Sequence, residues 1–185
     1  MTTPRLPAAD RRAQIRTAAA RLFASRGFHG VTIEDIGFSC GISGPAVYRH
    51  FPSKDALLGD LLVGISQHLL SGATEAVASG GGPDDLVQFH LDFSLQNPEL
   101  IRVQDRDLDN LGAAARKVRR LQRAYVNLWA SCIATTLPRL SPEEARARAH
   151  AVFGMLNSTP HSATGLDPQA IRSLLAKMAA AALAV

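Results

Sequence analysis

Hydrophobic positions along the chain repeat at helical spacing, and no segment alternates between apolar and polar residues as a strand does. In residues 9–26, apolar side chains recur every three or four positions, which predicts an amphipathic helix with one face in a core. This stripe consists of Ile15, Ala18, Ala19, Leu22 and Phe23. The long segment that begins at Ser53 has the same period, so the pattern predicts an all-α protein.

Glycines, prolines and capping residues divide this pattern into about nine helices. The strongest internal break is the run from Gly80 to Pro83, and further breaks fall at Asn97-Pro98 and Thr159-Pro160. The expected helices cover residues 9–26, 33–40, 44–50, 54–79, 83–97, 98–109, 112–137, 142–158 and 167–184.

The second and third of these helices are short, capped and joined by a glycine. Thr32 is placed to cap a helix with Asp35 three residues later, close to a capping box. Gly41 ends that helix, because the residue after a helix commonly needs a positive φ. Ser43 caps the next helix, which ends before Phe51. Three helix starts within about 22 residues are typical of a helix-turn-helix DNA reader.

Charge is concentrated in the same part of the chain. Residues 1–55 contain eight basic and four acidic side chains, whereas residues 56–185 contain twelve of each, so all of the net charge of +4 lies in the first segment. A basic module joined to a neutral body suits a polyanionic partner. We therefore expect a DNA-binding domain over 1–55 and a ligand-binding and dimerisation domain over 56–185.

Residues 10–58 resemble the DNA-binding domain of the tetracycline-repressor-like (TetR) family of bacterial transcriptional regulators. Besides the first stripe, the resembling residues are Arg26, Gly27, Phe28, Thr32, Ile33, Ile36, Gly41, Ile42, Ser43, Tyr48, Phe51 and Lys54. The resemblance implies a ligand-responsive regulator, usually a repressor. It binds a near-palindromic operator of double-stranded DNA as a homodimer and is released by a small-molecule effector. The chain departs from the family at Gly37-Phe38, where we expect a loosely wound helix, and at Gly44-Pro45.

The resemblance also implies which residues meet DNA. The expected set is Thr32, Ser43, Gly44, Pro45, Ala46, Tyr48, Arg49, His50 and Lys54. Lys54, at a helix start, is the strongest candidate for a phosphate contact. Each role has a structural alternative: Thr32 and Ser43 as caps, Tyr48 and His50 as packing residues, and Arg49 as a solvated side chain. Arg11 and Arg12 fit either DNA backbone contacts or plain surface charge.

The effector is expected among the central helices. The candidate ligand-binding residues are His90, Phe93, Arg106, Tyr125, Trp129, Asn157 and His161. The charged run 102–110 is equally explained by solvated ion pairs, and residues 157–161 either end a helix or line the pocket. A basic face at 116–123 either holds phosphate or meets water. We expect an anionic, partly apolar ligand such as an acyl-CoA or fatty acid in an otherwise apolar pocket. The alternative is a cationic drug, with Asp105 and Asp107 as counter-charges.

The last helices are expected to form the dimer interface, as in the family's four-helix bundle between subunits. The candidate interface residues are Phe153, Leu174, Leu175 and Met178. Several alanines in residues 167–184 allow close backbone approach, although an alanine-rich helix equally caps the core of its own domain.

Other function classes lack the residues that they need. The six histidines are scattered without ligand spacing, and no glycine-rich loop follows a strand, so we expect no enzyme, metal or cofactor. Cys40 and Cys132 lie far apart and are expected as reduced thiols. With no signal peptide and no 18-residue apolar stretch, the sequence indicates a cytoplasmic protein without a membrane span. A protein-interaction module without DNA binding is a remote alternative.

Overall fold

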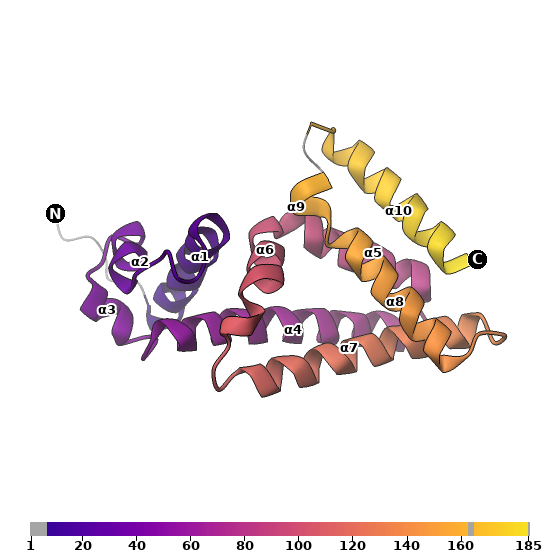
Figure 1. The fold of residues 1–185 in the computed structure, drawn as a ribbon, viewed down its shortest axis with the longest axis horizontal. Coiled ribbons are helices and arrows are strands. Elements are labelled where there is room, and N and C mark those ends of the chain that lie inside the picture. The colour runs from indigo at the N-terminus through magenta and orange to yellow at the C-terminus, as the bar shows by residue number, and fades with distance from the viewer. Residues whose placement is uncertain (1–6, 163–164, 185) are drawn as a thin grey trace.

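The computed structural model describes residues 7–162 and 165–184, and every regular element within these ranges is helical (Figure 1). The helices are α1 (Ala8–Arg26), α2 (Ile33–Ser39), α3 (Gly44–Tyr48), α4 (Lys54–Ala78), α5 (Pro83–Gln96), α6 (Pro98–Asp107), the 3₁₀ turn η1 (Leu108–Asn110), α7 (Ala115–Thr136), α8 (Pro142–Leu156), α9 (Thr159–Ser162) and α10 (Pro168–Ala184). The expected all-α fold is confirmed. The short helix α9 lies where the sequence indicated only a break.

Helix α4 is the spine of the molecule. It runs alongside α7 in the same direction, and near its start Gly59 lies so close to Ala114 that a Cβ at Gly59 would stand 2.7 Å from the Cβ of Ala114 (Figure 1). The first turn of α4 follows directly on α1–α3, which form the reading head. The rest of α4 lies among α5, α6 and α7. The spine therefore joins the reading head to the larger helical body.

One continuous core runs through both parts. Ile15, Phe23 and Ile36 of the reading head are fully buried, as are Leu62 of α4 and Trp129 of α7. Burial of each such side chain stabilises the fold by about 1.5–3 kcal/mol. The helical periodicity of the sequence predicts these positions because each stripe faces this core.

Helix α4 also corrects one expectation. By length and composition alone it is apolar enough to cross a membrane, contrary to the expectation that the chain has no such stretch. Half of the apolar window is buried inside the protein. On its surface Asp60 pairs with Arg12 and Arg16 of α1 at 2.6 and 3.2 Å. These contacts are those of a core helix.

Candidate DNA-reading surface and ligand cavity

The start of α2 has the capping geometry that the sequence predicts. The Thr32 hydroxyl oxygen accepts a hydrogen bond from the Asp35 backbone N–H at 3.1 Å, and the Asp35 carboxylate accepts from the Thr32 backbone N–H at 2.8 Å. These bonds from Thr32 hold the pKa of Asp35 below its ordinary value. The Thr32 hydroxyl also donates to the Asp35 carboxylate, so its role as a helix cap is confirmed. Its expected contact with a DNA phosphate remains a prediction.

The turn between α2 and α3 depends on two glycines. Gly41 has φ +66°, in the left-handed region that favours glycine. A Cβ on Gly37 would lie 2.8 Å from the carbonyl oxygen of Ile42, so only glycine lets α2 approach the turn this closely. Residues 33–39 form a continuous helix. The expected loosening at Gly37-Phe38 is therefore wrong, because Gly37 makes the α2–α3 crossing possible.

The exposed face of α3 is smaller than the sequence predicts. Ser43, Pro45, Tyr48 and Arg49 are exposed, and the hydroxyl of Ser43, although at the N-cap position, forms no cap bond. Among the expected DNA contacts, Gly44 and Ala46 are buried, so neither presents a side-chain surface to a groove. Ser43, Pro45, Tyr48 and Arg49 are therefore the positions of this segment with exposed side chains, and the expected DNA contacts remain predictions.

Two basic residues expected at DNA also form bonds within the reading head. The Lys54 ammonium donates to the carbonyl oxygens of Phe28 and Val31, both at 2.8 Å, and lies 4.4 Å from the centre of the Phe28 ring. Arg12 donates to the carbonyl of His50 at 2.6 Å as well as pairing with Asp60. One N–H of the Lys54 ammonium is left for its expected phosphate contact. Arg12 would have to give up its bonds to His50 and Asp60 in order to contact the DNA backbone.

A cavity of 230 Å³ lies among α4, α5, α6, α7 and α8. Its lining residues are Ser66, Leu69, His90, Gln104, Gln122, Tyr125, Val126, His150, Phe153 and Asn157. Seven of these ten residues carry hydrogen-bonding groups, and Leu69, Val126 and Phe153 add apolar surface. The cavity suits a ligand that has polar atoms as well as apolar surface.

Three hydrogen-bonded residues form part of the cavity wall. His90 Nδ1 lies 2.9 Å from the Tyr125 hydroxyl, and His90 Nε2 lies 2.9 Å from Asn157 Oδ1. With the amide oxygen as acceptor, the neutral ring carries its proton on Nε2 and accepts the Tyr125 proton at Nδ1. Burial lowers the pKa of His90 to about 4 and raises the pKa of Tyr125. Both side chains are therefore neutral at physiological pH.

The other four predicted ligand residues do not line the cavity. Phe93 and Trp129 are buried beside it, and the Trp129 ring centre lies 4.9 Å from that of Phe153. His161 is exposed on α9. Arg106 points away, toward the reading head. The polar residues on α4, α6 and α7 that do line the cavity have no distinguishing sequence signal, because they look like solvated helix positions.

Arg106 and its neighbour join α6 to the reading head. Arg106 donates to the backbone carbonyls of Phe23, by a short hydrogen bond, and of Ala24, at 3.4 Å. The buried Asp107 carboxylate accepts from the backbone N–H of Phe28 at 3.4 Å. These bonds fix the end of α1 to the end of α6.

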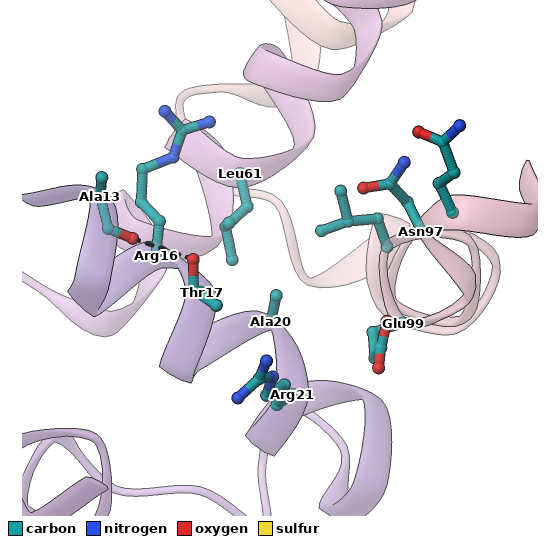
Figure 2. Close-up of a pocket in the computed structure, with 10 residues that line it drawn as sticks. Ala13, Arg16, Thr17, Ala20, Arg21, Leu61, Asn97 and Glu99 are labelled. Carbon is teal, nitrogen blue, oxygen red and sulfur yellow. Dashed lines mark hydrogen bonds between the residues drawn. The ribbon is translucent and has the colours of Figure 1, made fainter. Parts of the chain in front are cut away.

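An open cleft of 510 Å³ separates the same two parts farther along α1. Figure 2 shows Arg16 and Arg21 on the α1 side of this cleft and Asn97 and Glu99 on the other side, at the corner between α5 and α6, with Leu61 of α4 between the two sides. No ion pair crosses the cleft between described residues. The reading head is therefore bonded to α6 at one end of α1 and separated from it at the other.

Helix α10 has one covered and one uncovered apolar face. Leu175 is buried against the protein's own core and Phe153 stacks on His90 and Tyr125, so these two expected interface residues pack inside the subunit. Leu174 and Met178 are 47% and 45% exposed. The uncovered face of α10 is thus defined by Leu174 and Met178.

The sequence of the reading head decides the family. Residues 15–61 match the family model described as bacterial regulatory proteins, tetR family. This segment, which contains most of the reading head, is therefore a TetR-family DNA-binding segment.

Curated relatives match about two fifths of this chain. The transcriptional repressor KstR2 of Rhodococcus jostii is 39% identical over 70 residues, which are 38% of this chain and 34% of that protein. The transcriptional activator FasR of Mycolicibacterium smegmatis is 37% identical over 73 residues, 40% of this chain and 33% of that protein. The matched segment spans about a third of the length of these relatives.

Solved structures are similar to this chain over nearly its whole length. The ketosteroid regulator KstR2 of Mycobacterium tuberculosis has a TM-score of 0.80 at 18% identity, covering 94% of this chain and 93% of that one. FadR of Bacillus subtilis in complex with stearoyl-CoA has a TM-score of 0.69 at 16% identity, covering 90% of this chain and 96% of that one. AibR in complex with isovaleryl coenzyme A and operator DNA has a TM-score of 0.72 at 18% identity, covering 91% of this chain and 97% of that one. At these identities the likeness concerns the fold alone.

Proposed function

We propose that this protein is a ligand-responsive transcriptional regulator, acting as a repressor in the bacterial cytoplasm, that binds a near-palindromic operator as a homodimer. The exposed face of α3 carries this proposal: Ser43, Pro45, Tyr48 and Arg49 project from a short helix that the rest of the head braces. Side chains of this kind suit phosphate and base-edge contacts in a major groove. Sequence relatives named as a repressor and an activator support the regulatory role.

Binding to the DNA upstream of its own gene tests this role. Tyr48→Ala and Arg49→Ala are each expected to weaken binding by about 5–150-fold, which corresponds to about 1–3 kcal/mol for a lost specific contact. Arg139→Ala, which removes an exposed arginine far from the head, is the matched control. Fluorescence anisotropy at two salt concentrations measures the operator affinity of the two variants and of the control. Unchanged binding by Tyr48→Ala and Arg49→Ala would remove α3 as the reading helix.

The effector we propose is an acyl-CoA with a short acyl group. The cavity of 230 Å³ is smaller than the about 300–1,000 Å³ of drug-sized sites, so a short acyl chain fits better than a long one. Gln104, Gln122 and Asn157 have side-chain amide N–H groups that can donate to a thioester carbonyl. FadR and AibR, which share the fold, were solved with CoA esters.

The cationic alternative lacks support at the cavity. No Asp or Glu is among its described lining residues. Asp107 is engaged by Phe28 and Arg106, and burial raises the pKa of Asp105. Thermal-shift screening of acyl-CoA esters of increasing length against cationic drugs distinguishes the two. A shift with cations only would overturn the proposed ligand class without touching DNA binding.

A further inference from the structure

Helix α7 carries a stripe of four arginines on the face that points away from the core. Their spacing of i, i+3, i+4 and i+7 places them within about 100° of arc and along about 10 Å of helix. The residues of this arginine stripe are Arg116, Arg119, Arg120 and Arg123. Val118, Tyr125 and Trp129 occupy the opposite, buried face. Residues 110–142 contain no aspartate or glutamate.

None of the four arginines has an acidic partner among residues 7–162 and 165–184. All are exposed, and none forms an ion pair or hydrogen bond within the described part of the chain. By contrast, Arg12, Arg106 and Arg172 each contact a carboxylate. Like charges one helical turn apart repel by about 0.2–0.5 kcal/mol per pair. The stripe thus lowers stability without a compensating contact in the protein itself.

The stripe borders both a hollow and the ligand cavity. Arg116, Arg119 and Arg123 line a surface hollow of 400 Å³ together with Gly112, Ala113 and Ala115. Gln122 and Val126 on the same helix line the cavity. Since Arg119 is three residues before Gln122 and Arg123 three before Val126, the two sites are neighbours on the α7 surface.

We propose that the arginine stripe binds the phosphate groups of a coenzyme A moiety while the acyl group occupies the cavity. This inference rests on the proposed acyl-CoA effector. A planar guanidinium matches a phosphate with two parallel hydrogen bonds, and CoA carries a pyrophosphate and a further phosphate on its ribose. The stripe makes the regulator respond to CoA thioesters and ignore the corresponding free acids.

Calorimetric titration with free CoA tests the stripe without the acyl chain. The wild type is expected to bind CoA, and Arg119→Gln with Arg123→Gln to bind it at least tenfold more weakly, because one charge-assisted hydrogen bond contributes about 1.5–3 kcal/mol. Arg139→Gln with Arg146→Gln, which removes two exposed arginines outside the stripe, should bind CoA as the wild type does. All substituted side chains are exposed, and thermal denaturation checks that each variant folds.

Three results would overturn the inference. They are a wild type that does not bind CoA, equal loss in the control variant, and butyrate bound as tightly as butyryl-CoA. A stripe variant that loses operator DNA in the absence of ligand but still binds CoA would assign the stripe to DNA instead. Operator binding by the wild type is measured in parallel, so failure of the regulatory function itself is seen separately.

Discussion

His90 is a buried titratable side chain whose protonation competes with the fold. Its pKa of about 4 in the folded protein lies below the about 6.5 of an exposed histidine. The unfolded chain therefore binds the proton more tightly, and stability is lost as the pH falls from about 6.5 toward 4. We expect this group to lower the free energy of unfolding by about 2 kcal/mol between pH 7 and pH 5. Urea denaturation at the two pH values measures the change.

The matched variant is His90→Gln, which removes the titration but keeps hydrogen-bonding groups. Its stability should be lower at pH 7, because its amide does not reproduce the bonds to Tyr125 and Asn157. The difference between the wild type and this variant should shrink at pH 5. A difference that is constant across this range would show that His90 is not held neutral.

Gly37 is a second residue whose role depends on a close contact. Gly37→Ala would bring a Cβ within 2.8 Å of the Ile42 carbonyl, and overpacking of this kind typically costs about 1–3 kcal/mol. We expect lower stability and weaker operator binding, because the α2–α3 crossing must open. Gly112→Ala, whose Cβ would meet nothing within 4 Å, should change stability by less than about 0.5 kcal/mol. Equal effects in chemical denaturation would contradict the assigned role of Gly37.

At the scale of elements, α6 connects the ligand cavity to the reading head. Gln104 lines the cavity, and two residues later Arg106 is bonded to the end of α1. We expect Arg106→Gln to retain effector affinity within about twofold while the effector loses most of its influence on operator affinity. Coupling between sites commonly amounts to about 5–150-fold, and operator titrations with and without effector measure it.

Arg102→Gln on the same helix is the control for this coupling. Arg102 donates to the carbonyl of Pro160 in α9, within the larger helical body. Removing that bond leaves the link to α1 in place, so the effector should still release the operator. If both variants couple normally, the bonds from Arg106 to α1 do not transmit the signal.

Local sequence patterns predict the helices of this protein but not the contacts between residues that are distant in the chain. Helices and their core stripes were predictable, because apolar periodicity and caps such as Thr32 are local signals. The reading head was recognisable for the same reason. The role of Arg106 was not, because its acceptors are backbone carbonyls more than 80 positions away. Likewise, the sequence around Lys54 does not indicate whether its ammonium contacts a DNA phosphate or the carbonyl and ring of Phe28.

At the scale of the whole molecule, we expect the uncovered face of α10 to pair two subunits and so to set the distance between their two reading heads. Leu174 and Met178 are exposed in the single subunit although Leu175 beside them is buried. A two-fold dimer would cover such a face with its own copy. Two heads fixed in this way would lie one DNA turn or a multiple of it apart, so the operator would be near-palindromic with half-sites at that spacing.

Charge at this face is expected to separate the subunits. Met178→Glu and Leu174→Glu each place a carboxylate where we expect apolar contact between subunits. Val77→Glu is the control, because it places a carboxylate at an exposed apolar position on α4, outside that face. Sedimentation velocity should show monomers for the first two variants and dimers for the control. Operator affinity should fall by about 10²–10⁴, because the second half-site then binds without linkage to the first. Dimers that persist in both α10 variants would place the subunit interface on another surface, and a monomer with full operator affinity would show that one head is sufficient.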